Sequence, residues 1–379
     1  MLDHSFEKLE PILKSDDPAR SLDYLIGQFR DAKEFHLLFE ARLMKKRLEL
    51  GLPLIQPPDI ASLTGETQAT YQQYMVEAAQ EAGESFLAGG DIPKAWPYLR
   101  ATGDVARVAA AIDQVEPGDN IDPIIEIAFL QGVHPAKGIE LALAKYGICR
   151  ALTYFGSSGG QKDRAECIAV LARNVHAELV EQLAGAIEER EGSRPGSTSV
   201  AELIEGRDWL FGEYSSYIDP SHLVSLLQYS PEVTDTEILQ LFHDFCLYGT
   251  RLSSNFQFPG QPPFENSFVD FGHYVQTLLG VDADDHISHF RKKAEAAGDN
   301  HGNWPAQVLI NLLVRLGRFA EALQLSLKYL PDARAGEISC PTALQLCELA
   351  GDFDRLAALA RKRGDVLTYI AAHLEPVRS

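Results

Sequence analysis

The segment 282–289 concentrates side chains that could bind a metal ion. If it forms a helix, Asp282, His286 and His289 lie at positions i, i+4 and i+7 and share one face. Asp285 and His289 form a second pair, at i and i+4. Carboxylate and imidazole groups arranged in this way can coordinate a divalent ion such as zinc. The alternative interpretation is a helix start, at which aspartates cap the helix and complement its dipole.

Residues 206–289 form the part of the chain in which a small-molecule pocket is expected. They hold several aromatic residues and five of the 11 histidines. Pockets combine aromatic walls with a few convergent polar groups. The candidate ligand-binding residues are therefore His222, Tyr248, Arg251, Asp270 and His273. The alternative is a helical bundle that holds aromatic side chains in its core and histidines at its rim. His176, inside a predicted long helix, is expected to be structural.

The chain lacks the commonest catalytic motifs. It contains no G-x-S-x-G, H-E-x-x-H, G-x-G-x-x-G or paired C-x-x-C sequence. This weighs against the usual hydrolases, metalloproteases and dinucleotide enzymes. An enzyme whose residues converge only in space remains open, so the sequence does not decide whether the chain is an enzyme. We expect no cofactor, and a divalent metal is the one alternative.

Composition limits the classes of partner. The chain has 379 residues, of which 45% are hydrophobic and 23% charged, and its formal net charge is −20. Nucleic acids and anionic membranes would repel such an acidic protein, so neither is an expected partner. The five cysteines are scattered and odd in number, which is typical of reduced thiols in a cytoplasmic protein. No signal peptide and no long apolar run is recognisable.

The hydrophobic pattern predicts an all-α protein. Apolar residues recur at helical spacing along most of the chain, as at Leu22, Leu25, Ile26 and Phe29, and no β-type alternation persists over several strands. A capping box at Thr234-x-x-Glu237 predicts the start of one helix.

A glycine-closed turn recurs along the chain. Gly317 lies between two apolar helical patterns, and Gly351 repeats the same phrase after 351 − 317 = 34 residues. Gly90 belongs to an earlier copy. Glycine adopts the left-handed conformation that closes a helix without a steric penalty. A period near 34 residues is typical of stacked helical hairpins.

These observations predict an α-solenoid of antiparallel helical hairpins with an irregular helical middle region. We expect N-terminal helices in residues 1–60 and a helical repeat region in 61–195. A central helical region with an aromatic loop should follow in 196–300, and C-terminal helical hairpins in 301–379.

The sequence around Gly317 resembles a tetratricopeptide repeat (TPR). Phe319 provides the aromatic residue two positions after the turn glycine, and Ala322 provides the small residue three positions further. Gly351 and Phe353 repeat the first two features.

The resemblance is partial and covers two parts of the chain, near residues 74–115 and 304–374. Members of this family usually bind peptides in a concave groove. The resemblance therefore implies a scaffold or adaptor that binds a protein or peptide, and the acidic composition favours a partner with basic residues. The sequence does not set the oligomeric state.

Overall fold

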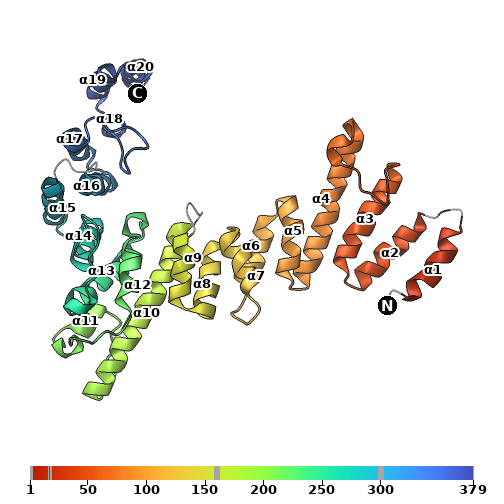
Figure 1. Ribbon diagram of the computed structural model, residues 1–379, viewed down its shortest axis with the longest axis horizontal. Coiled ribbons are helices and arrows are strands. Elements are labelled where there is room, and N and C mark those ends of the chain that lie inside the picture. Colours follow the sequence, from red (N-terminus) through yellow and green to blue (C-terminus); the bar gives the residue numbers. More distant parts are fainter. Residues whose placement is uncertain (1–2, 16, 18, 158–162, 298–302, 379) are drawn as a thin grey trace. The chain divides into compact units, whose positions relative to one another are not determined.

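The protein is helical throughout the part that can be described. The computed structural model describes residues 3–15, 17, 19–157, 163–297 and 303–378. In these ranges the chain consists of helices joined by turns and loops, with two isolated β-bridges and no β-strand (Figure 1). The predicted all-α class is confirmed.

Two compact units make up the chain. Unit 1 comprises residues 1–163 and unit 2 comprises residues 164–379. The expected divisions at residues 60 and 195 stay predictions, and the one at residue 300 lies outside the described residues.

Unit 1 contains eleven elements in its described residues. They are α1 (Asp3–Leu13), α2 (Arg20–Asp31), α3 (Phe35–Glu49), η1 (Ile60–Ser62), α4 (Gly65–Ala88), α5 (Ile92–Thr102), α6 (Val105–Asp113), α7 (Asp122–Ile125), η2 (Glu126–Leu130), α8 (Pro135–Tyr146) and α9 (Ile148–Ser157).

Consecutive helices of unit 1 pack against each other, with α2 on α3, α3 on α4 and α4 on α5. The α4–α5 contact is close because Gly83 has no side chain: a Cβ atom there would lie 2.6 Å from Cγ of Leu99. Leu99 and Trp96 belong to a buried cluster that continues through α6 and η2 to Val133. Burial of this apolar surface stabilises the unit.

Unit 2 contains the remaining elements. They are α10 (Arg164–Glu191), α11 (Val200–Ile204), η3 (Asp208–Leu210), α12 (Pro220–Leu227), η4 (Ser230–Glu232), α13 (Thr236–Arg251), η5 (Ser254–Phe256), α14 (Ser267–Leu279), α15 (Ala283–Ala297), α16 (Trp304–Arg315), α17 (Phe319–Tyr329), α18 (Ala343–Ala350), α19 (Phe353–Arg363) and α20 (Val366–Arg378).

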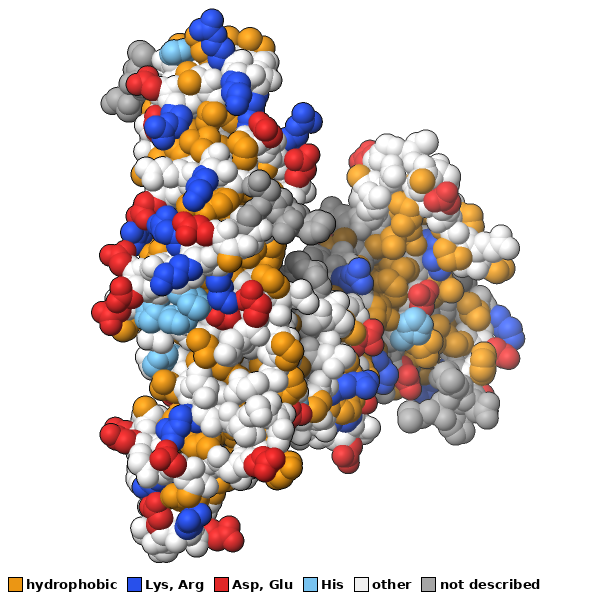
Figure 2. All heavy atoms as spheres, turned by 60° about the vertical axis from the view of Figure 1, so that its left-hand side comes forward, with side chains coloured by type: hydrophobic (Ala, Val, Ile, Leu, Met, Phe, Trp, Pro, Cys, Tyr) orange, Lys and Arg blue, Asp and Glu red, His pale blue; other side chains and the backbone are white. Residues whose placement is uncertain are grey.

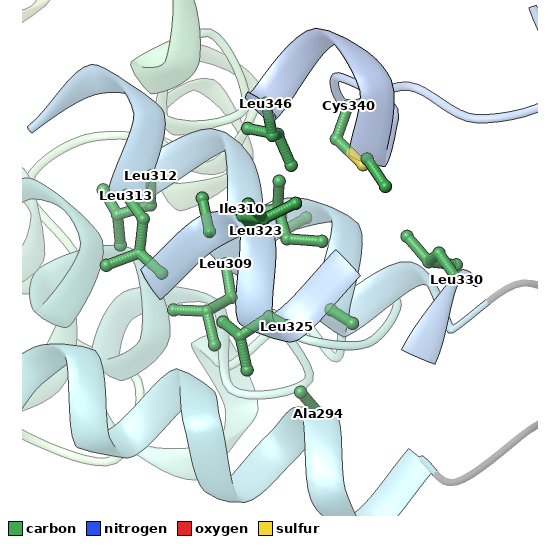
Figure 3. Close-up of a cluster of buried hydrophobic side chains, with 14 of the residues drawn as sticks. Ala294, Leu309, Ile310, Leu312, Leu313, Leu323, Leu325, Leu330, Cys340 and Leu346 are labelled. Carbon is green, nitrogen blue, oxygen red and sulfur yellow. The ribbon is translucent and has the colours of Figure 1, made fainter. Parts of the chain in front are cut away.

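From α13 onward, each helix of unit 2 packs against the next. Side chains of α15 to α18 meet in one apolar cluster, shown in Figure 3 for residues from Ala294 to Leu346. Leu309, Ile310 and Leu313 of α16 are completely buried within it. The i, i+1, i+4 spacing of these three residues shows that α16 is covered over a wide part of its circumference.

The predicted glycine turns are confirmed. Gly90, Gly317 and Gly351 have φ angles of 78°, 71° and 65°, in the left-handed region. Each lies between two helices separated by only two or three residues. A residue with a Cβ atom would be strained there, which is why glycine marks these corners.

The predicted capping box at Thr234 is wrong. The side chain of Asp235 caps α13 by accepting a hydrogen bond of 2.8 Å from the backbone N–H of Glu237. The helix thus begins one residue later, since the carboxylate of Asp235 already occupies the N-cap position.

None of the helices in the described ranges has both the length and the apolar character that a bilayer-spanning segment needs.

Candidate functional site

The structure brings together several of the predicted site residues where α14 packs on α15. Asp270 and His273 lie one turn apart on α14, and His286 and His289 lie one turn apart on α15. Residues three apart share a helix face, so both pairs meet at the helix contact. Histidine side chains gather on this face of the molecule beside acidic and basic ones (Figure 2). We call these four residues and Lys293 the histidine cluster.

The imidazole rings of the histidine cluster contact one another directly. Nδ1 of His273 lies 2.7 Å from Nδ1 of His286, so one of these nitrogens must donate a proton and the other accept it. The rings of His273 and His289 stack with centroids 4.0 Å apart and planes 21° apart. Two positively charged groups would repel each other at these distances.

Asp270 is the buried carboxylate of the histidine cluster. Its side chain is 2% exposed, and its Oδ1 atom accepts a hydrogen bond of 2.7 Å from Nε2 of His289. Its Oδ2 atom accepts from Nζ of Lys293 at 2.9 Å and from the N–H of Asn266 at 2.8 Å. A buried carboxylate is tolerated because each oxygen has a polar partner.

The surroundings favour the neutral form of two histidines, His273 and His243. Burial lowers the pKa of His273, and the nearby His289 and His286 lower it further. Burial also lowers the pKa of His243 on α13, where Asp244 opposes the shift and His286 adds to it. Neutral imidazole is the form that binds a metal or accepts a proton.

Metal coordination is not preformed in this cluster. In the described parts of the chain, no three His, Cys, Asp or Glu side chains are placed to hold a metal ion. The two Nδ1 atoms of His273 and His286, 2.7 Å apart, are closer than two ligands of one tetrahedral zinc at about 2.0–2.1 Å from each nitrogen. The rings would have to separate before an ion could enter.

Asp282 and Asp285 have exposed side chains. The carbonyl of Asp282 accepts hydrogen bonds from the N–H groups of Asp285 and His286, at 3.0 and 3.3 Å. These are the contacts of a helix start, because α15 begins at the next residue.

The other candidate ligand-binding residues have different partners. Tyr248 is completely buried, and its hydroxyl accepts a hydrogen bond of 2.9 Å from the N–H of Tyr217. Arg251 pairs with Asp208 and lies 4.6 Å from the ring centroid of Phe211. His222 lies in the first turn of α12, with its Nε2 atom 3.9 Å from Oδ2 of Asp219. The partners just named, Tyr217, Asp208 and Asp219, are not members of the histidine cluster.

A groove in unit 2 is a second candidate site. Its volume is about 480 Å³, and it is lined by α12, η4, the loop before α14, and parts of α14 and α16. Four aromatic side chains line it: Phe264, Phe271, Tyr274 and Trp304. Phe264 stacks on Phe271 with centroids 4.0 Å apart. Trp304, at the start of α16, is 47% exposed and is therefore available to a ligand.

The polar groups of this groove are uncharged. They are supplied by Gln228, Gln261, Ser267, Asn311 and Ser339, and among the described residues no Asp, Glu, Lys, Arg or His lines the groove. Amides and hydroxyls can donate and accept hydrogen bonds with a peptide backbone. A neutral apolar lining of this kind suits an uncharged ligand, because a charged group would lose hydration without gaining a partner.

Arg315 holds the groove walls together. From α16 it donates hydrogen bonds to the carbonyl oxygens of Ser230 and Pro231, at 3.2 and 3.1 Å, and to that of Val233. Only part of this site was predictable from the sequence: the aromatic loop lies in the predicted central region, whereas Trp304 and Gln228 carry no local signal.

Comparison with models of protein families, with curated proteins and with solved structures yields no match for this chain.

Proposed function

We propose that the chain is a TPR-like helical-repeat protein that acts as an interaction module. It would bind an extended segment of a partner protein in the groove of unit 2, as a scaffold or adaptor does. The observation that carries this proposal is the groove itself, which combines four aromatic rings with uncharged hydrogen-bonding groups.

The chemistry of the groove describes the segment that would fit. Aromatic walls bind apolar and proline-containing extended peptides, whose backbone carbonyls accept hydrogen bonds from side-chain donors. Gln228 and Asn311 can supply such donors. The net charge of −20 favours a partner with basic residues, which would flank the uncharged segment rather than enter the groove.

The glycine turns support the architectural part of the proposal. Left-handed glycines at residues 90, 317 and 351 join successive helices in the way that an α-solenoid of antiparallel hairpins requires. The cytoplasm is the proposed location, because Cys246, Cys340 and Cys347 are buried free thiols, as is typical of proteins in a reducing compartment.

A selection from a random peptide library, followed by fluorescence anisotropy on selected peptides, tests this function. Apolar or proline-rich peptides should emerge. Trp304→Ala should weaken their binding by about tenfold or more, as expected for a tryptophan that contacts the ligand. Tyr214→Ala is the matched control, because Tyr214 is an aromatic residue of the same unit, 79% exposed and outside the groove.

Two results would contradict the proposal. One is a library that yields no peptide above background. The other is a set of selected peptides that bind Trp304→Ala as tightly as they bind the unchanged chain.

The second candidate is an enzyme or ligand-binding protein with a His/Asp site in residues 206–289. It is favoured by the convergence of Asp270, His273, His286 and His289. A bound divalent metal would require the rings of His273 and His286 to separate. Elemental analysis of the purified chain tests this candidate: it predicts a stoichiometric metal that disappears in the double variant H286A/H289A. Metal-free protein that takes up no zinc on titration would exclude the metal.

A further inference from the structure

Unit 1 contains a small open cavity of about 200 Å³. It is bordered by α7, η2, α8 and α9, and its lining combines carboxylates, aromatic rings and aliphatic side chains: Asp122, Ile125, Glu126, Leu130, Tyr146 and Tyr154. It is chemically unlike the groove of unit 2, whose lining in the described part of the chain is uncharged.

The backbone around this cavity departs from a regular α-helix. The segment η2 is a π-helix, in which the N–H of Gln131 donates to the carbonyl of Glu126 over five residues, at 3.0 Å. Such wide turns occur frequently at functional sites. They place Glu126 and Leu130 on the cavity wall. Gly138 lets α8 approach η2, because a Cβ atom there would lie 2.7 Å from Cβ of Phe129.

The two tyrosines of the cavity already attract cations of the chain itself. Their rings meet edge to face, with centroids 6.3 Å apart and planes at 87°. The guanidinium carbon of Arg150 lies 5.7 Å from the ring centroid of Tyr146 and 5.2 Å from that of Tyr154. Nζ of Lys145 lies 5.4 Å from the ring centroid of Tyr146. Cations within about 6 Å of a ring face are attracted by its quadrupole, and both rings also border the cavity.

Negative charge accompanies the rings. Oδ1 of Asp122 accepts a hydrogen bond of 2.7 Å from Lys145 and another from the hydroxyl of Tyr146. These two donors hold the pKa of Asp122 below its ordinary value, so the carboxylate stays ionised at neutral pH. Glu126 lines the same cavity from η2. Two carboxylates and two aromatic rings therefore surround a space that is open to solvent.

We infer that this cavity binds the alkylammonium group of a lysine side chain, methylated or unmethylated, presented by a partner protein. The rings of Tyr146 and Tyr154 would contact the cation, the carboxylates of Asp122 and Glu126 would neutralise it, and Leu130 would contact its carbon atoms. A protein source fits the open rim, where Leu130 is 60% and Tyr146 is 39% exposed. This site is independent of the proposed groove and does not rest on it.

Binding is measured on the full chain by isothermal titration calorimetry with four probes. They are a short neutral-flanked peptide with one lysine, its trimethyllysine form, the same peptide with a carbon isostere of trimethyllysine, and free tetramethylammonium. Both cationic peptides should bind. The neutral isostere should bind about tenfold more weakly, because it lacks the charge that the rings and carboxylates attract. The free cation should bind more weakly than the peptides.

Variants locate the site. Tyr154→Leu should weaken binding of the trimethyllysine peptide by about tenfold, and Glu126→Gln, at an exposed position, should weaken it without affecting the fold. Tyr74→Leu is the matched control, since the ring of Tyr74 also has two cations of the chain, at 5.0 and 5.2 Å, and does not line this cavity. Thermal melting confirms that each variant is folded.

Three outcomes would overturn the inference. Equal affinity for the charged peptide and its neutral isostere would exclude recognition of a cation. Unchanged affinity in both Tyr154→Leu and Glu126→Gln would place binding elsewhere. Affinity for tetramethylammonium equal to that for the peptides would exclude a partner protein as the source.

Discussion

Substitution of Gly249 by alanine tests the close contact between α13 and α14 in unit 2. Gly249 lies in the last turn of α13, and Phe268 lies in the first turn of α14. A Cβ atom at residue 249 would lie 2.1 Å from Cδ1 and 2.3 Å from Cγ of Phe268. The Phe268 side chain is completely buried, so its ring cannot move aside without displacing its neighbours.

The expected magnitude is the balance of two effects. Alanine in a helix interior is favoured over glycine by about 1 kcal/mol. Overpacking of a buried site costs typically about 1–3 kcal/mol, and distances near 2 Å put this contact at the upper end. We expect Gly249→Ala to lower the free energy of unfolding by about 2 kcal/mol.

Gly272 provides a control on the same pair of helices. A Cβ atom there would lie 3.5 Å from Cβ of Cys246, an ordinary contact. Gly272→Ala should therefore raise the free energy of unfolding by about 0.5–1 kcal/mol, through helix propensity alone.

Hydrogen exchange measured by mass spectrometry separates the two variants, because it reports on local opening of α13 and α14 even when the two units unfold independently. Peptides from residues 236–279 should exchange faster in Gly249→Ala and no faster in Gly272→Ala. If Gly249→Ala protected these peptides as well as Gly272→Ala does, the close approach of α13 to α14 would be wrong.

Three further predictions concern charge and hydrogen bonding in unit 2. The lowered pKa values of His243 and His273 mean that the unfolded chain binds more protons than the folded chain at mildly acidic pH. The contribution of these groups to the free energy of unfolding should therefore be fully present above their unfolded pKa near 6.5. It should fall as the pH drops towards their pKa values in the folded chain, by up to about 1.4 kcal/mol per pH unit for each group. Urea unfolding at pH 7.5 and pH 5.5 measures this fall, which should shrink in the double variant H243Q/H273Q. Asp270→Asn should lower the free energy of unfolding by about 2 kcal/mol, because it removes the charge that pairs with the partly exposed Lys293; thermal melting at pH 7.5 measures this loss. Arg315→Met should cost about 2 kcal/mol, since three carbonyl groups lose a charged donor, and should speed proteolysis in residues 228–233.

Each of these predictions has a result that contradicts it. A slope with pH that is unchanged in H243Q/H273Q would assign the acid sensitivity to other groups. An Asp270→Asn variant as stable as the original chain would mean that the pairs with His289 and Lys293 contribute nothing. Unchanged proteolysis in Arg315→Met would show that η4 is held by apolar contacts alone.

The helical architecture was predictable because its signals are local. A glycine such as Gly351 closes a helix through its own φ angle, and a neighbouring polar residue caps the next helix within three positions. The wrong N-cap prediction at Thr234 is also a local matter. Thr234 and Asp235 are both good N-caps, and the choice between them depends on where the following backbone enters the helix.

The candidate site was predictable only within each helix. The spacing of Asp270 and His273, and that of His286 and His289, places each pair on one helix face. That the two faces meet depends on how α14 packs on α15, which no local pattern specifies. His176 shows the same limit: its contact of 2.9 Å with Asp244 joins α10 to α13 across 68 residues of sequence.

The groove lies further from local prediction because it assembles distant segments. Gln228 and Ser339 line the same space although 111 residues (339 − 228) separate them in sequence. The sequence around Trp304 indicates only a residue in the first turn of a helix, next to a proline. Only the packing of α16 against α14 and the loop before it gives this tryptophan its place at the groove.

Helix α14 connects the two candidate sites of unit 2. Phe271 and Tyr274 line the groove, whereas Asp270 and His273 contact α15 in the histidine cluster. Successive residues on a helix point about 100° apart, so a single helix serves both sites through adjacent positions. A rotation or shift of α14 would therefore disturb both. A substitution in the cluster that weakens peptide binding without speeding hydrogen exchange in α14 must act through lost charge, whereas one that also speeds exchange acts through displaced packing.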